Sequence, residues 1–166
     1  MRSRIVGWLG SLLVGVALSS CSDSTDPGPP CADPDGGTFV SHPPDALRGC
    51  ASYAVASSGG STNTVLLVSV GPLTSPTTLL SLVRPGARPA MGTYQIGANP
   101  GNFSGSILMN GSTFSVTSGT VTIDASLEGD LQGSVGATGV QSGSGASITV
   151  AGVFTAVCTP SGSITC

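Results

Sequence analysis

Five cysteines are the residues of this chain whose type and spacing could carry chemistry. The first is Cys21, and the other four are Cys31, Cys50, Cys158 and Cys166. A zinc site needs closely spaced pairs such as C-x-x-C, usually with histidines, and this chain has no such pair and one histidine, His42. We therefore predict no metal site and no cofactor. An even set of four cysteines in an exported chain predicts two disulfide bonds instead.

The pairing of these cysteines stays open, because four cysteines allow three pairings. We favour a nested arrangement, in which Cys50 bonds to Cys158 and Cys31 bonds to Cys166. These residues flank the first and last predicted strands, and antiparallel neighbours would bring them together. The local alternative joins Cys31 to Cys50 and Cys158 to Cys166.

Candidate acids and bases are few. His42, in "SHPPD", is the only histidine base that the chain offers. Asp124, Glu128 and Asp130 bracket a predicted turn, where paired carboxylates could act as acid and base. Turn acids are more often solvated, and the G-x-S-x-G nucleophile motif is missing. We therefore predict that the protein is not an enzyme, and an envelope enzyme using these turn carboxylates is the second alternative.

Positive charge is sparse. Arg84 and Arg88, in "RPGARP", could present cations to an anionic ligand, although a rigid exposed loop with solubilising charges explains them better. Together with Tyr94 they are the weak candidates for a ligand site, and the ligand is unknown. If Arg2 and Arg4 leave with a signal peptide, three arginines face eight acids, which gives a net charge of −5. Nucleic acid is not an expected partner, because phosphate binding needs clustered basic residues.

The first 20 residues have the pattern of an export signal. Arg2 and Arg4 form a basic start, and residues 5–18 form an acid-free, mostly apolar run. This run ends after about 14 residues, short of the roughly 20 that a membrane-spanning helix needs. We therefore predict a helical signal peptide over residues 1–20.

The tetrapeptide "LSSC", residues 18–21, resembles the lipobox of bacterial lipoproteins. The resemblance implies that Cys21 becomes the first residue of the mature chain and carries diacylglycerol, often with a further acyl group such as palmitate on its amine. Two or more acyl chains anchor a protein stably in a membrane, whereas one does so only marginally. Since Ser22 and not an aspartate follows the cysteine, the resemblance implies the outer membrane. The expected location is the bacterial cell envelope, with the membrane as one partner and an envelope protein as a second.

A polar segment separates Cys21 from the rest of the chain. Residues 22–30 contain Ser, Asp, Thr, Gly and Pro and no large apolar side chain, so we expect residues 21–30 to form the lipidated cysteine and a flexible tether. Nine extended residues reach about 30 Å at roughly 3.3 Å each. Residues 31–166 are long enough for one domain with one core.

Alternating apolar and polar residues dominate this domain, which predicts β-strands. Asn110-Gly111 between two such runs is a strong signal for a hairpin. We expect about nine strands by this rule, over residues 52–57, 64–70, 77–83, 92–97, 103–109, 112–118, 120–126, 131–137 and 147–158.

The same alternation assigns the faces of the strands in the second half of the domain. The residues expected to point inward are Phe114, Val116, Val121, Ile123, Leu131, Val135, Ile148, Val150 and Phe154, and those expected to face water are Thr113, Ser115, Thr120, Thr122, Ser147 and Thr149. Short connections predict an all-β antiparallel meander, which must close into a β-sandwich or a squat barrel to avoid long exposed edges. Gly105, Gly133, Gly136 and Gly152 would permit the bends that closure requires.

Two C-terminal stretches, "SGTVTIDASLEGDLQGSV" and "ASITVAGVFTAVC", are similar to the C-terminal part of uncharacterised bacterial envelope lipoproteins. This resemblance implies a β-rich fold and brings no known activity and no functional residues. The leading hypothesis is therefore a lipid-anchored envelope protein with a structural or interaction role. The first alternative is a β-barrel that binds a small apolar ligand in a cavity.

Overall fold

The computed structural model of the chain describes residue 31 and residues 37–42, 47–73, 75–127, 129–158 and 164–165, the last two by their backbone alone. The predicted signal peptide and tether, Cys21, Glu128 and Cys166 lie outside the described residues. Within them the regular structure is entirely β, which confirms the predicted fold class.

The described residues form ten β-strands. Their bounds are β1 Gly37–Ser41, β2 Arg48–Ser58, β3 Ser61–Val70, β4 Thr78–Pro85, β5 Gly92–Ile96, β6 Ser104–Met109, β7 Ser112–Leu127, β8 Asp130–Val140, β9 Ser147–Cys158 and β10 Ile164–Thr165.

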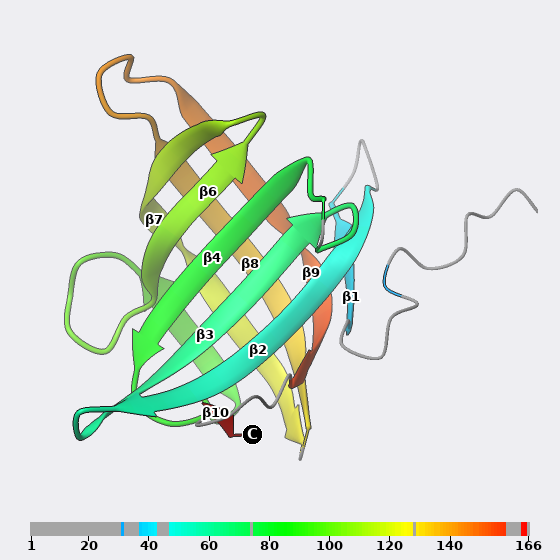
Figure 1. The fold of residues 1–166 in the computed structure, drawn as a ribbon, viewed down its shortest axis with the longest axis vertical. Coiled ribbons are helices and arrows are strands. Elements are labelled where there is room, and N and C mark those ends of the chain that lie inside the picture. Colours follow the sequence, from blue (N-terminus) through cyan, green and yellow to red (C-terminus); the bar gives the residue numbers. More distant parts are fainter. Residues whose placement is uncertain are drawn as a thin grey trace, which may run out of the picture.

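The hydrogen-bonded strands close into a ring (Figure 1). Neighbours follow the order β1-β9-β8-β7-β6-β4-β3-β2, and β2 then pairs with β1. The ring makes the fold a barrel and not a two-sheet sandwich. Closure removes the exposed edges that an open sheet of this size would present.

The seam of the barrel lies along β2. β1 pairs antiparallel with both β2 and β9, in each case over four of its five residues. Beyond the start of β1, β2 and β9 pair directly and in parallel, with Ser52 opposite Val157 and Tyr53 opposite Cys158. Farther along, the two residues of β10 pair with Val55 and Ala56. Segments from both ends of the domain therefore complete the wall.

β1 and β10 were not predicted from the sequence. β1 holds a single large apolar residue, Phe39, in a segment rich in Gly, Pro and Asp, so its alternation is too short to recognise. Its pattern is nevertheless that of a strand, because Phe39 is fully buried and its neighbours Thr38 and Val40 are exposed. Partners on both sides, and not local propensity, hold this segment extended.

The two strands predicted over residues 112–118 and 120–126 form one long strand, β7. Register shifts between Val116 and Ser118 and between Ile123 and Ala125 mark two bulges. The first bulge moves the inward positions from even to odd residues, so that Phe114 and Val121 face the same interior. The first half of β7 pairs with β6, and the second half pairs with β5.

The interior of the barrel is packed with apolar side chains. The predicted inward residues are buried or, for Val116 and Ile148, partly buried against the core, and the predicted outward residues are exposed or half-exposed. Leu66, Leu80 and Leu82 add to the same core from β3 and β4. The alternation rule is therefore confirmed for the faces of β7, β8 and β9.

Three of the four predicted bend glycines, Gly105, Gly133 and Gly152, lie where neighbouring backbones come very close. A Cβ added at Gly105 would collide with the carbonyl oxygen of Ser81, and one added at Gly133 would collide with that of Thr122. By contrast, a Cβ at Gly136 would meet open space. Gly105 and Gly133 thus permit a close approach between paired strands that any larger residue would block.

Candidate functional site

One end of the barrel is hollowed into a pocket of about 360 Å³, which we call the mouth pocket. It lies where β1, β3 and β6 end and where β4 and β9 begin. Its apolar lining comes from Phe39, Leu47, Val70, Met109, Ile148 and Val150, and its polar lining includes Ser41, His42, Thr78 and Thr149.

Strand register explains the shape of the mouth pocket. Thr78 is paired with Val70 on one side and with Met109 on the other, so these three form one row across β3, β4 and β6. The next row toward the interior contains Val68, Leu80 and Ile107, which are fully buried. The mouth pocket is therefore a cup with a closed base.

His42 lies at the rim of the mouth pocket. Its backbone N–H donates a hydrogen bond to the carbonyl oxygen of Ala151 at 3.0 Å, which extends the pairing of β1 with β9 by one residue. Its side chain is exposed. The backbone of His42 is thus held beside the apolar pocket. Its imidazole can donate a hydrogen bond to a ligand or accept one from it.

Arg84 and Tyr94 meet at the opposite end of the barrel. The guanidinium carbon of Arg84 lies 4.8 Å from the centre of the Tyr94 ring, a cation–π contact, and Tyr94 packs edge-on against Phe103 at 5.9 Å between ring centres. Arg84 also donates to the carbonyl oxygen of Gly101 at 3.2 Å. The guanidinium group of Arg84 and the hydroxyl group of Tyr94 therefore both form hydrogen bonds within the protein itself.

Arg88, the third ligand candidate, makes its contact apart from the pair formed by Arg84 and Tyr94. It donates to the carbonyl oxygen of Leu127 at 2.7 Å and so ties the loop before β5 to the end of β7. The Tyr94 hydroxyl donates to the carbonyl oxygen of Ala90 at 2.9 Å within the same loop. None of the three candidates lines the mouth pocket.

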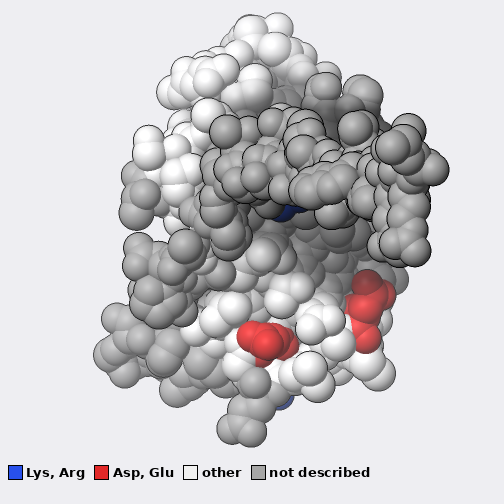
Figure 2. Space-filling view, turned by 90° about the vertical axis from the view of Figure 1, so that its right-hand side faces the viewer, with Lys and Arg blue, Asp and Glu red and all other residues white. Residues whose placement is uncertain are grey.

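Asp124 lines a different hollow, of about 260 Å³, on the outer wall of the barrel. It sits in the second bulge of β7, near Gln132 of β8 and Thr155 of β9. Asp130 stands at the start of β8, opposite Leu127. Seen from the side of β1 and β9, the described surface is largely uncharged, with separate acidic patches (Figure 2). The described carboxylates therefore do not share a pocket with His42.

Metal-ligating residues do not gather in the described part of the chain, where no group of three His, Cys, Asp or Glu side chains lies close enough to hold an ion. Glu128, the remaining turn carboxylate, lies outside the described residues.

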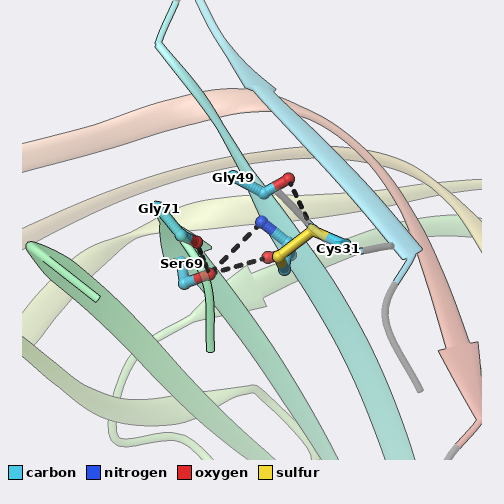
Figure 3. The surroundings of a disulfide bond; sticks show 5 residues. Cys31, Gly49, Ser69 and Gly71 are labelled. Carbon is cyan, nitrogen blue, oxygen red and sulfur yellow. Dashed lines mark hydrogen bonds between the residues drawn. A yellow bond between two sulfur atoms is a disulfide. The ribbon is translucent and has the colours of Figure 1, made fainter. Parts of the chain in front are cut away.

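A disulfide bond joins Cys31 to Cys50 (Figure 3). The two Cα atoms are 5.6 Å apart, and Cys50 is buried. The Ser69 hydroxyl accepts a hydrogen bond from the Cys50 backbone N–H at 3.2 Å and donates to the Gly71 carbonyl oxygen at 2.7 Å. This buried serine holds β2, β3 and the disulfide together at the mouth end.

The favoured nested pairing is therefore wrong, and the local alternative is correct for Cys31 and Cys50. The physical reason is the alternation of β2. Ala51 and Tyr53 point into the core, so Cys50 points outward, whereas Cys158 belongs to the core cluster inside the barrel. A bond between Cys50 and Cys158 would have to cross the wall. Cys158 is also disulfide-bonded.

Comparisons with protein-family models, with curated proteins and with solved structures find no match to this chain. The resemblance of its N-terminus and C-terminal strands to bacterial lipoproteins stays a prediction. In the described residues, no helix has the length and apolar character required to cross a membrane.

Sequence reasoning offered a ligand cavity as an alternative but missed the residues that line the mouth pocket. Its lining comes from residues in or next to the ends of five strands, which the alternation rule treats like any other position. The sequence signal that could have indicated this pocket is the presence of sizeable side chains at inward positions near the ends of strands. Val70, Thr78 and Ile148 occupy inward positions at strand ends, where loops and not facing strands must fill the space above them.

Proposed function

We propose that the protein is a lipid-anchored protein of the bacterial cell envelope, held in the outer membrane through acyl chains on Cys21, with a structural or binding role and no catalytic chemistry. The predicted signal peptide, the lipobox resemblance and the polar segment after it support this proposal. An export pathway also provides the oxidising compartment in which disulfide bonds persist.

The observation that carries the proposal is the position of the Cys31–Cys50 disulfide. Cys31 directly follows the predicted tether of residues 22–30, and its bond to Cys50 fixes that end of the tether to the barrel wall. The residue that follows the predicted tether is therefore covalently linked to the domain. This is the arrangement that an anchored domain needs if its orientation near the membrane is to be limited.

Intact-mass analysis tests the proposal. The protein is expressed in a bacterium that processes lipoproteins, purified from membranes and measured before and after reduction with thiol alkylation. We expect loss of residues 1–20, acyl chains on Cys21 and four alkylated thiols only after reduction. The matched control is Cys21→Ser, which removes the acylated sulfur and leaves the domain unchanged. A mature chain without acyl groups would overturn the anchor.

A further inference from the structure

The mouth pocket has the make-up of a site for one apolar chain with a polar end. Its apolar lining includes Val70, Met109 and Ile148, and its polar groups include His42 at the rim and Thr78 in the same row as Val70 and Met109. Sites for small ligands are typically clefts of about 300–1,000 Å³ with mostly apolar lining and a few polar groups, and the mouths of barrels are a frequent location. A pocket of 360 Å³ is at the small end of this range, which favours a single chain.

The disulfide places the predicted tether beside this pocket. Cys50 contacts Ser69, the residue directly before Val70, and Val70 lines the mouth pocket. The Sγ atom of its partner Cys31 lies 3.3 Å from the carbonyl oxygen of Gly49, one residue closer to the start of β2. Cys31, the residue that follows the predicted tether, is therefore bonded to β2 close to a residue that lines the mouth pocket.

The lengths of tether and barrel then decide which end lies closer to the membrane. The nine residues 22–30 reach at most about 30 Å. β2, which runs from the mouth end toward the Arg84 end, has 11 residues and is about 36 Å long at roughly 3.3 Å per residue. An anchor attached at the mouth end holds the mouth pocket within reach of the lipid surface.

We propose that the mouth pocket binds the acyl chain of a fatty acid taken from the membrane to which the protein is anchored. The chain lies against Val70, Met109 and Ile148, and the carboxylate receives hydrogen bonds from His42 at the rim and from Thr78 in the pocket wall. An imidazole N–H and a hydroxyl both donate to carboxylate oxygens. This inference deepens the proposed function and rests on the lipid anchor for the source of the ligand.

Photo-crosslinking tests the proposal. The lipidated protein is placed in phospholipid nanodiscs that contain a diazirine derivative of decanoic acid, illuminated and digested, and the labelled peptides are identified by mass spectrometry. We expect label on the peptides that contain Met109 and Ile148, displaced by excess decanoate. Decanol should compete about tenfold less well, because it lacks the charge-assisted hydrogen bonds of a carboxylate. Label spread evenly over the outer wall, or undisturbed by decanoate, would overturn the proposal.

A pair of tryptophan variants controls for nonspecific labelling. Thr78→Trp fills the mouth pocket from a half-buried position and should lower its labelling at least about tenfold, because several methylene groups lose their contacts. Thr113→Trp adds the same side chain on the exposed face of β7 and should leave labelling unchanged. If Thr78→Trp fails to fold, Met109→Trp fills the same pocket from β6 and carries the same expectation. Unchanged labelling in a folded pocket variant would refute the site.

A lengthened tether separates the source of the ligand from the site itself. Insertion of 20 Gly and Ser residues after Ser24 should slow labelling from the bilayer and leave competition by dissolved decanoate unchanged. If intact mass finds no acyl chains but decanoate still blocks mouth labelling, the pocket stands and the anchor falls. If the protein is lipidated but the mouth pocket is not labelled, the anchor stands and the pocket proposal falls.

Discussion

At the scale of single residues, the barrel contains one buried polar atom without a described partner. The hydroxyl of Tyr53 is fully buried among the described residues and makes no hydrogen bond with them. Burial of an unsatisfied hydroxyl costs about 1–3 kcal/mol, whereas a satisfied one contributes roughly 1 kcal/mol. Tyr53 therefore fills the core with its ring at a cost from its hydroxyl.

The substitution Tyr53→Phe tests this reading. We expect the free energy of unfolding to rise by about 1 kcal/mol, because the ring stays and the unsatisfied group is removed. Tyr94→Phe is the matched control and should lower it by about 1 kcal/mol, since it deletes the hydrogen bond to Ala90. Urea denaturation followed by circular dichroism measures both. A loss of stability in Tyr53→Phe larger than that in Tyr94→Phe would mean that the hydroxyl has a partner.

At the scale of elements, β7 shows how sequence alternation can be right about faces and wrong about boundaries. The apolar positions change from even to odd after Val116, in the region where we predicted two separate strands. The chain instead stays extended and absorbs the change in a bulge, next to Gly119 with its φ of 140°. Neighbours on both sides, β8 and then β5 or β6, make one continuous strand more favourable than a break.

Two glycines of β8 give a matched test of the close strand crossings. Gly133→Ala should lower the free energy of unfolding by about 1–3 kcal/mol, because the added methyl group would collide with the Thr122 carbonyl oxygen and force the strands apart. Gly136→Ala, three residues farther along, meets open space and should change stability little or raise it by up to about 1 kcal/mol. Equal losses in the two variants would contradict this account of barrel closure.

At the scale of the whole molecule, the Cys31–Cys50 disulfide connects the N-terminal segment to the barrel. It closes a loop with a sequence separation of 19 that contains all of β1. A crosslink of this length is expected to stabilise the folded chain by about 3 kcal/mol, through the entropy of the unfolded chain. The bond therefore holds in place the short strand that completes the ring.

The double substitution Cys31→Ser with Cys50→Ser should lower the free energy of unfolding by about 3 kcal/mol. Hydrogen exchange should increase most in β1, which has five residues and depends on its two neighbours for order. Proteolysis of the unsubstituted protein without reduction should give a peptide in which Cys31 is linked to Cys50. A peptide linking Cys50 to Cys158 would instead restore the nested arrangement.

The sequence by itself determined the all-β class, the hairpin at Asn110-Gly111 and the inward faces of β7 to β9. These follow from local chemistry, because alternation and turn residues act over a few positions. Only the tertiary structure decided that the ring closes as a barrel, that Phe39 lies in a strand and that Cys50 faces away from Cys158. It also brought Val70, Thr78, Met109 and Ile148 together at one mouth. Each of these depends on which strands become neighbours, and pairing between distant segments is set by packing and register that no short stretch of sequence contains.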